Sequence, residues 1–218
     1  MILISDPAVA AVPVVECGEP LRAVAGVAGL MLDVRKADPR GRYGLLRAGV
    51  LDRLCRAQAR LPAGLHLLVI EGYRPPALQE AYFADYAGEL RRAHPDWPAE
   101  RVEIQASRYI SPPRVAPHPA GAAVDLTLCA QNGDELGMGT AVNASPEESA
   151  GACYFAAPQI TGTARANRDL LAAVLSGAGL VNYPTEWWHW SYGDRYWAYT
   201  TGAAQARYGP IDSRTVEP

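Results

Sequence analysis

Residues 118–128 read His118-Pro-Ala-Gly-Ala-Ala-Val-Asp-Leu-Thr-Leu128, and they join a loop to a strand. The residues before and at the start of this stretch, 111–120, include four prolines and therefore predict an irregular loop. Small residues follow at 121–123, where the backbone has room to turn, and the apolar run 122–128 predicts a buried strand. One histidine and one aspartate thus stand seven residues apart, in the loop and in the strand after it.

A second stretch, Glu186-Trp-Trp-His-Trp-Ser-Tyr192, predicts an aromatic strand over 186–192. It places a glutamate three residues before His189. In an extended strand these two side chains would point to opposite faces, because successive side chains alternate. For both to serve one site, the strand must be bulged or must start between them, and spacing alone leaves both alternatives open.

Periodicity elsewhere predicts mostly helices, with one more buried strand at 65–70. The predicted helices cover 44–61, 77–94, 98–109 and 165–176. We therefore expect an α+β fold, a single domain over 1–218 with a small, mostly antiparallel sheet flanked by helices. We also expect an N-terminal extension at 1–22 and a mobile loop at 144–163, where patterning is weak.

Composition excludes several function classes. The chain has 218 residues, a net charge of −3 and no run of basic residues, which argues against a nucleic-acid partner. Lys36 is the only lysine, which we attribute to genomic base composition. The start of the chain lacks the basic residues of a secretory signal, and no run of 18 apolar residues exists, so we expect a cytoplasmic enzyme without a membrane partner. The four cysteines are far apart and support neither a cysteine zinc site nor a disulfide framework.

The chain has four histidines, and two of them stand near carboxylates at the spacings above. A catalytic zinc takes three protein ligands from imidazole and carboxylate groups, leaves a position for water, and needs a nearby base. Two histidines, one aspartate and one glutamate supply such a set. Either pair alone is more often an ordinary surface or core feature, but together they favour a metal site.

Five stretches in the same order resemble motifs of the D-alanyl-D-alanine dipeptidases, the VanX-type zinc peptidases. Residues 118–128 resemble the family's H-x-x-G-x-A-x-D-L-T-L, and 186–189 match its E-W-W-H. Residues 71–75, 138–140 and 167–171 resemble its D-G-Y-R-P, M-G-S/T and N-R-x-L-L. The resemblance covers most of the chain, from about 32 to 192.

This resemblance implies roles residue by residue. His118, Asp125 and His189 would bind Zn²⁺ at the sheet, and Glu186 would be the general base and acid. Arg74 would stabilise the oxyanion of the tetrahedral intermediate, although a salt bridge to Glu71 is an alternative explanation for that arginine. The remaining predicted contacts are with a dipeptide or other small-molecule substrate. They are assigned to Tyr73, Ala116, Asn143 and Trp188.

The chain departs from the family where the substrate's amino group would be recognised. Ala116 replaces a serine two residues before the first ligand, and Asn143 replaces an aspartate after M-G-S/T. The N-F-T-G stretch is also missing around 38–43. Because these changes remove an acceptor and a negative charge, we hypothesise that D-Ala-D-Ala is not the preferred substrate. Alternatively, Asp134 or Glu147 replaces the missing charge.

Two other functions fit the same motifs. One is a D,D- or L,D-carboxypeptidase that acts on cell-wall peptides. The other is a binding module that holds zinc without catalysis, although such a module would need neither Glu186 nor Arg74. Nothing in the sequence predicts the oligomeric state.

Overall fold

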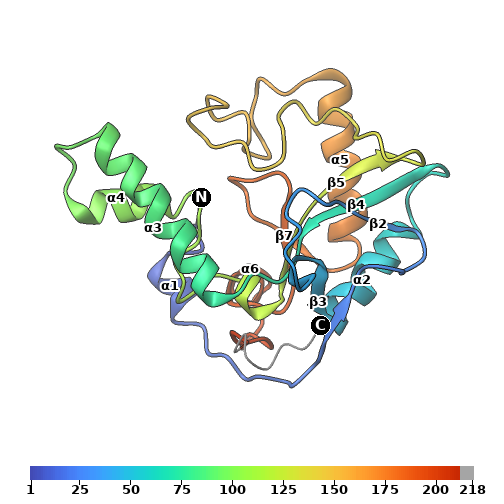
Figure 1. The fold of residues 1–218 in the computed structure, drawn as a ribbon, viewed down its shortest axis with the longest axis horizontal. Coiled ribbons are helices and arrows are strands. Elements are labelled where there is room, and N and C mark those ends of the chain that lie inside the picture. The colour runs from blue at the N-terminus through green and yellow to red at the C-terminus, as the bar shows by residue number, and fades with distance from the viewer. Residues whose placement is uncertain (212–218) are drawn as a thin grey trace.

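A five-stranded sheet runs through the centre of the molecule in the order β2-β4-β5-β7-β6 (Figure 1). The computed structural model describes residues 1–211. The strands of this sheet are β2 (Leu30–Leu32), β4 (Leu65–Glu71), β5 (Ala123–Ala130), β6 (Val181–Asn182) and β7 (His189–Ser191). Within the described sheet, β2 and β4 are parallel and every other neighbouring pair is antiparallel. The predicted α+β class and mostly antiparallel sheet are therefore confirmed.

Helices cover both sides of the sheet. They are α1 (Pro7–Ala10), α2 (Ala48–Gln58), α3 (Pro76–Ala93), α4 (Ala99–Ala106), α5 (Gly162–Ser176) and α6 (Arg195–Thr201), with 3-10 turns η1 (Arg42–Gly44) and η2 (His118–Ala120). In Figure 1, α2 and α5 lie on one side of the sheet, and α3 and α4 lie on the other. None of the helices in the described part of the chain is long and apolar enough to cross a bilayer.

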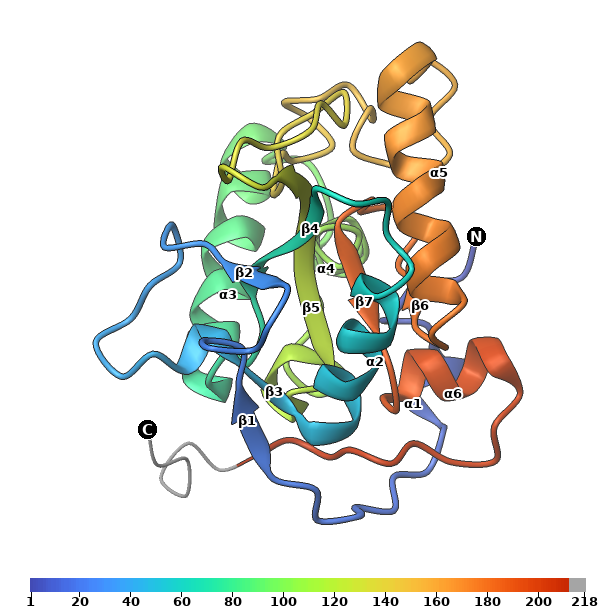
Figure 2. The same ribbon diagram turned by 90° about the vertical axis from the view of Figure 1, so that its right-hand side faces the viewer.

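The main core lies between the sheet and the α2–α5 layer (Figure 2). Helix α2 buries Val50, Leu51 and Leu54, whose spacing places them on one face. Every residue of β5 before Ala130 is buried, and Val124 and Leu126 belong to the same apolar cluster. The continuous apolar run that predicted this strand reflects burial on both of its faces.

Two predicted elements differ most from their bounds in the structure. The predicted helix over 44–61 starts only at Ala48, because Leu45–Arg47 forms strand β3, which pairs with β1 (Leu21–Ala23) in a separate two-stranded sheet. The predicted strand over 186–192 is confined to His189–Ser191. In the first case a pairing between distant segments overrides the local pattern, and in the second a turn closed by the hydrogen bond from Glu186 N to Tyr183 O precedes the strand.

Sheet register brings three polar side chains into line across the centre. Glu71 of β4 stands opposite Asp125 of β5, which in turn stands opposite His189 of β7. The register of β4 shifts between Val69 and Glu71, and such an irregularity re-aims the side chain that follows it. Directly opposed residues share one face of a sheet, so this row forms the floor of a site.

The segment 144–163 runs as a series of turns up to the start of α5. Arg168 of α5 donates hydrogen bonds to two of its carbonyls, Ala152 O at 2.9 Å and Tyr154 O at 2.8 Å. The mobility of the segment 144–163 stays a prediction. The four cysteines are all free thiols.

Candidate active site

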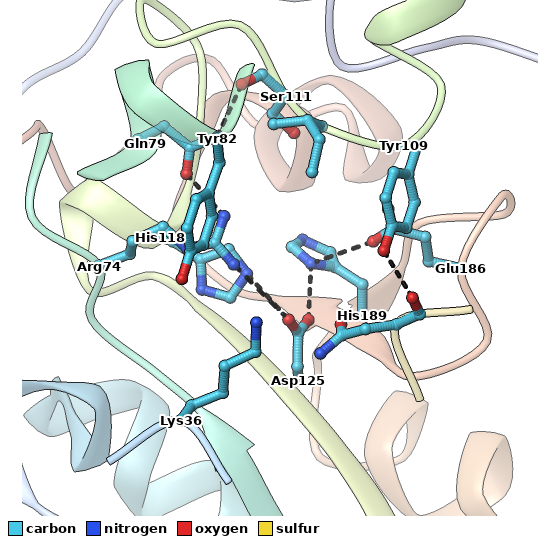
Figure 3. Close-up of a pocket in the computed structure, with 12 residues that line it drawn as sticks. Lys36, Arg74, Gln79, Tyr82, Tyr109, Ser111, His118, Asp125, Glu186 and His189 are labelled. Atoms are coloured by element: carbon cyan, nitrogen blue, oxygen red, sulfur yellow. Dashed lines mark hydrogen bonds and ion pairs between the residues drawn. The ribbon is translucent and has the colours of Figure 1, made fainter. Parts of the chain in front are cut away.

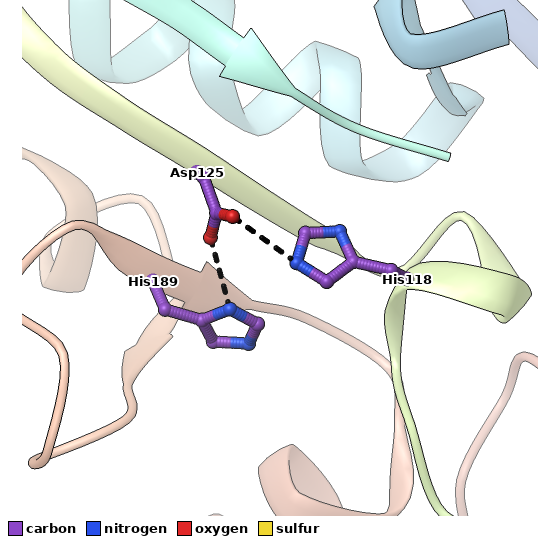
Figure 4. A group of neighbouring side chains, drawn as sticks. All are labelled: His118, Asp125 and His189. Carbon is purple, nitrogen blue, oxygen red and sulfur yellow. Dashed lines mark hydrogen bonds and ion pairs between the residues drawn. The ribbon is translucent and has the colours of Figure 1, made fainter. Parts of the chain in front are cut away.

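Three buried side chains converge at the centre of the sheet (Figure 4). His118 comes from η2, Asp125 from β5 and His189 from β7. One nitrogen or oxygen atom from each lies within 4.8 Å of the others. The structure therefore brings together the three residues that the sequence predicted as metal ligands.

His118 is oriented by the backbone of the neighbouring strand end. Its Nδ1 lies 2.7 Å from Gly72 O and donates to this carbonyl, which leaves Nε2 as the ring nitrogen that faces the cluster. That Nε2 lies 3.5 Å from Asp125 Oδ2. The turn that carries the histidine ends at Gly121, whose φ of 65° is left-handed. A Cβ at Gly121 would also lie 2.4 Å from the side chain of Leu21, so a glycine suits this position.

Asp125 and His189 form the closest contact in the group. The His189 Nδ1 to Asp125 Oδ1 distance is 3.0 Å. Burial alone would raise the pKa of Asp125, but the charges and hydrogen bonds of both histidines hold it well below its usual range. Burial lowers the pKa of His189 despite the attraction of Asp125, which favours the neutral imidazole that a metal requires.

Glu186 lies beside this group in the turn before β7. Strand β7 starts at His189, so the alternation of side chains along a strand does not apply to Glu186. Of the two alternatives left open by the sequence, a bulged strand or a strand that starts between these residues, the second is correct. The side-chain amide of Asn182 donates to Glu186 O and to His189 O, both at 2.9 Å, and these two hydrogen bonds hold the turn in place. Glu186 Oε2 lies 3.6 Å from His189 Nδ1. Burial and repulsion from Asp125 raise the pKa of Glu186, while Arg74 opposes the rise.

Arg74 lies on the other side of Asp125. Its Nε and Nη2 donate to the two carboxylate oxygens of Glu71 at 2.7 and 2.6 Å, and Nη1 donates to Gln79 Oε1 at 2.9 Å. Its Nη2 lies 4.0 Å from Asp125 Oδ2. The salt bridge that stood as an alternative role for Arg74 is thus present. This salt bridge takes two of the five N–H groups of the Arg74 guanidinium, so it does not exclude a second role for the side chain.

A small pocket of about 60 Å³ opens over the cluster (Figure 3). Asn143 lines it, as predicted for a substrate contact, and has a left-handed backbone with φ of 63°. Tyr109 donates from its hydroxyl to Asn143 O at 2.5 Å. Six further lining residues were not predicted. They are Lys36, Gln79, Tyr82, Tyr109, Ile110 and Ser111.

Three predicted substrate contacts lie outside this lining. Tyr73 is buried, and its hydroxyl donates to Ile211 O at 3.2 Å. Trp188 is buried in the main core, where its ring meets Trp187 edge-on. Ala116 lines a different hollow, beside Asp194. None of these three residues lines the pocket over the cluster, and their assignment as substrate contacts stays a prediction.

The two acidic residues offered as substitutes for the missing aspartate also lie elsewhere. Asp134 accepts a hydrogen bond from the Asn132 side chain at 2.7 Å, and Glu147 accepts one from the Tyr86 hydroxyl at 2.6 Å. Both are exposed, and neither lines the pocket. The carboxylates among the described lining residues are Asp125 and Glu186.

The donor set fits a divalent metal such as zinc. Zinc binds nitrogen and oxygen ligands at about 2.0–2.2 Å, which with tetrahedral angles separates ligand atoms by roughly 3.3 Å. The measured separations of Asp125 from His189 and His118 are 3.0 and 3.5 Å. His118 Nε2 faces this centre and completes a set of two imidazoles and one carboxylate.

A protein-family match covers most of the chain. The family model described as D-ala-D-ala dipeptidase, peptidase family M15, matches residues 34–206. The chain belongs to this family of metallopeptidases.

Two curated relatives are both named D-alanyl-D-alanine dipeptidase. The protein from Synechocystis is 30% identical over 221 residues, which covers 87% of this chain and 88% of the relative. The protein from Escherichia coli is 32% identical over 127 residues, covering 58% of this chain and 55% of the relative.

Solved structures show more distant likeness. The LD-carboxypeptidase LdcB aligns over 85% of this chain and 73% of its own, with a TM-score of 0.47 and 17% identity. VanYB in complex with D-alanine-D-alanine aligns over 83% of this chain and 88% of its own, with a TM-score of 0.45 and 16% identity.

Proposed function

We propose that this chain is a zinc-dependent hydrolase that cleaves a dipeptide or small amide in the manner of a D-Ala-D-Ala dipeptidase. The family membership supports the reaction class. One observation carries the assignment of residues: a buried carboxylate, Glu186, and a buried guanidinium, Arg74, lie on opposite sides of the three-donor cluster. A structural metal site would need neither group.

His118 Nε2, Asp125 and His189 Nδ1 would hold the metal. A zinc ion bound there supplies Lewis acidity, which polarises the scissile carbonyl and activates water near neutral pH. The lowered pKa values of Asp125 and His189 favour the ionised carboxylate and the neutral imidazole that metal binding requires.

Glu186 is the proposed general base and then general acid. It would accept a proton from the attacking water and deliver it to the leaving nitrogen. A carboxylate performs both steps best when its pKa lies near the working pH, and burial raises the pKa of Glu186 in that direction.

Arg74 is the proposed oxyanion stabiliser. Glu71 and Gln79 accept from three of its five N–H groups. The two that remain, one on each terminal nitrogen, are available to the negative charge that develops on the carbonyl oxygen. Because Glu71 holds the guanidinium in place before substrate arrives, little reorganisation is needed during the reaction.

We further propose that the enzyme does not require a free substrate amine. An ammonium group would need a carboxylate partner. Asp125 is committed to the metal, Glu186 to proton transfer, and the nearby wall offers the amide of Asn143 instead. An acylated dipeptide should therefore be accepted at least as well as a free one.

The test is hydrolysis by zinc-loaded protein of D-Ala-D-Ala, L-Ala-L-Ala and their N-acetyl forms. An N-acylated tripeptide ending in D-Ala-D-Ala detects a carboxypeptidase. We expect Glu186→Gln to lower kcat about 100- to 10,000-fold with unchanged zinc content. Glu100→Gln, which neutralises an exposed carboxylate on α4, is the matched control and should leave kcat unchanged.

Two results would contradict the proposal. Full turnover by Glu186→Gln would remove the glutamate from the mechanism. Zinc binding by a wild-type protein that hydrolyses none of the substrates would instead favour a non-catalytic binding module.

A further inference from the structure

The only lysine in the chain lines the proposed substrate pocket. Every other basic side chain apart from the histidines is an arginine. Lys36 is half-buried, and Figure 3 shows its side chain directed toward Asp125. Its ammonium lies 5.3 Å from the centre of the Tyr82 ring, whose other cationic neighbour is Arg74 at 4.9 Å.

The backbone around Lys36 is held in place by its neighbours. Asp33 N donates to Val69 O at 2.8 Å, which continues the pairing of β2 with β4. Ala37 N donates to Val34 O at 3.0 Å and closes a turn with Lys36 inside it. Arg35, the preceding residue, forms ion pairs with Asp33 and Glu135. Arg35 therefore satisfies its charge within the protein and secures the turn.

Lys36 has no such partner. Among residues 1–211, its one recorded interaction is with the face of Tyr82, and no carboxylate oxygen lies within ion-pair distance of its ammonium. The neighbouring carboxylates have other partners. Glu71 is paired with Arg74, Asp125 with the two histidines, and Glu186 lies against His189.

An ammonium without a carboxylate partner in a recessed pocket leaves a positive charge that an anionic ligand can balance. The Arg74 charge is already offset by Glu71, and Asp125 with ionised Glu186 balances a divalent metal, so the Lys36 charge remains in excess. The pocket is therefore electropositive when loaded. A carboxylate is the anionic group that a peptide substrate carries within a few bonds of its last amide.

We propose that Lys36 determines specificity by binding the carboxylate of the substrate, so that this enzyme selects peptides or N-acyl amino acids with a free carboxyl end. This inference rests on the proposed hydrolase function, because it places the carboxylate beside the bond that the site would cleave. It also gives the single lysine a function, in place of the genomic explanation offered from composition.

The experiment measures equilibrium binding in zinc-loaded Glu186→Gln protein, so that turnover does not interfere. The probes are N-acetyl-D-Ala-D-Ala and its C-terminal amide, with the L,L pair alongside. The acid carries one charge and the amide carries none, so their ratio of Kd values isolates carboxylate recognition. Each of three further substitutions is added separately to the Glu186→Gln protein: Lys36→Met, Lys36→Arg and Arg91→Met. The last removes one positive charge from the exposed surface of α3 and serves as the control.

We expect the acid to bind about 10- to 100-fold more tightly than the amide, as for a charge-assisted hydrogen bond. Lys36→Met should abolish this ratio by weakening the acid alone, Lys36→Arg should keep most of it, and Arg91→Met should keep all of it. Equal weakening of acid and amide by Lys36→Met, an unchanged ratio, or no binding of any probe would overturn the inference. Failure of the hydrolase proposal is distinct, since wild-type protein would then bind the acid selectively and cleave nothing.

Discussion

Glu71 and Arg74 form a buried ion pair, and it lies beside the candidate metal ligand Asp125. The carboxylate stands opposite Asp125 in the sheet and takes two hydrogen bonds from the guanidinium. Removing one partner of such a pair leaves an uncompensated charge in the interior and also frees the remaining side chain to move.

Glu71→Gln should therefore lower kcat about 10- to 100-fold, because Arg74 would lose the partner that sets its orientation. Zinc content should not change, since Glu71 contributes no donor to the cluster. Steady-state kinetics together with metal analysis check this. A loss of zinc in the variant would show that Glu71 acts on the metal site instead.

The same pair predicts how stability depends on pH. Burial raises the pKa of Glu71, but the charge and hydrogen bonds of Arg74 lower it more, so its folded-state pKa lies below the ordinary value. The pair therefore stabilises the fold fully above the unfolded pKa of about 4.3, and this contribution is lost as pH falls through the lower folded pKa.

Urea unfolding of metal-free wild-type and Glu71→Gln protein between pH 7 and 3 measures this contribution. We expect a difference of about 3–5 kcal/mol at pH 7 that shrinks below about pH 4. A difference that grows toward acid pH would have the wrong sign for a depressed carboxyl pKa.

Among the elements, α5 holds the long segment 144–163 against the body of the protein. Arg168 is fully buried and donates to Met138 O as well as to the carbonyls of Ala152 and Tyr154. Burial, with repulsion from Arg165, lowers the pKa of Arg168 to about 10. The arginine of the N-R-x-L-L motif thus serves as a structural clamp.

Arg168→Met should destabilise the protein by about 3 kcal/mol, because three carbonyls would lose a charged donor. Limited proteolysis should then cut within 144–163 faster than in the wild type. Arg92→Met on the exposed surface of α3 should change stability by less than about 0.5 kcal/mol. Equal proteolysis of the Arg168 variant and wild type would contradict the clamp.

The elements also show what the sequence could predict. Long apolar runs predicted β4 and β5 nearly at their observed bounds, because burial on both faces leaves a local signature. The three-residue strands β1 and β3 were missed, since their stability comes from pairing with each other across distant segments.

In the site, too, local sequence motifs were predictable, whereas contacts between distant segments were not. Motifs predicted the cluster residues, which the structure brings together, and also Glu186 and Arg74. They did not predict the wall formed by Gln79 and Tyr82, whose position depends on how α3 packs across from the sheet. Composition did contain a signal for Lys36, since a single lysine among many arginines is unusual.

For the whole molecule, the proposed site joins segments that are far apart in sequence. The sheet supplies Asp125 and His189, the turn η2 supplies His118, and α3 supplies the facing wall and carries a separate small apolar cluster with α4. A metal that binds only the folded state must therefore stabilise the entire arrangement.

Zinc at 100 times its Kd should add about 2.7 kcal/mol of stability. For a chain of this size that corresponds to a rise in Tm of roughly 5–10 °C, measurable by calorimetry with and without chelator. His189→Ala should abolish the rise. A rise that persists in this variant would mean that the ion binds elsewhere.

The sheet register also determines when the proposed site can exist during synthesis. His189 follows its partner Asp125 by 64 residues, and both must be paired across β5 and β7 before the donors meet. A nascent chain on the ribosome has two donors long before it has the third. Metal capture would therefore wait until His189 has been synthesised and paired, and a translation product interrupted before that residue would stay inactive.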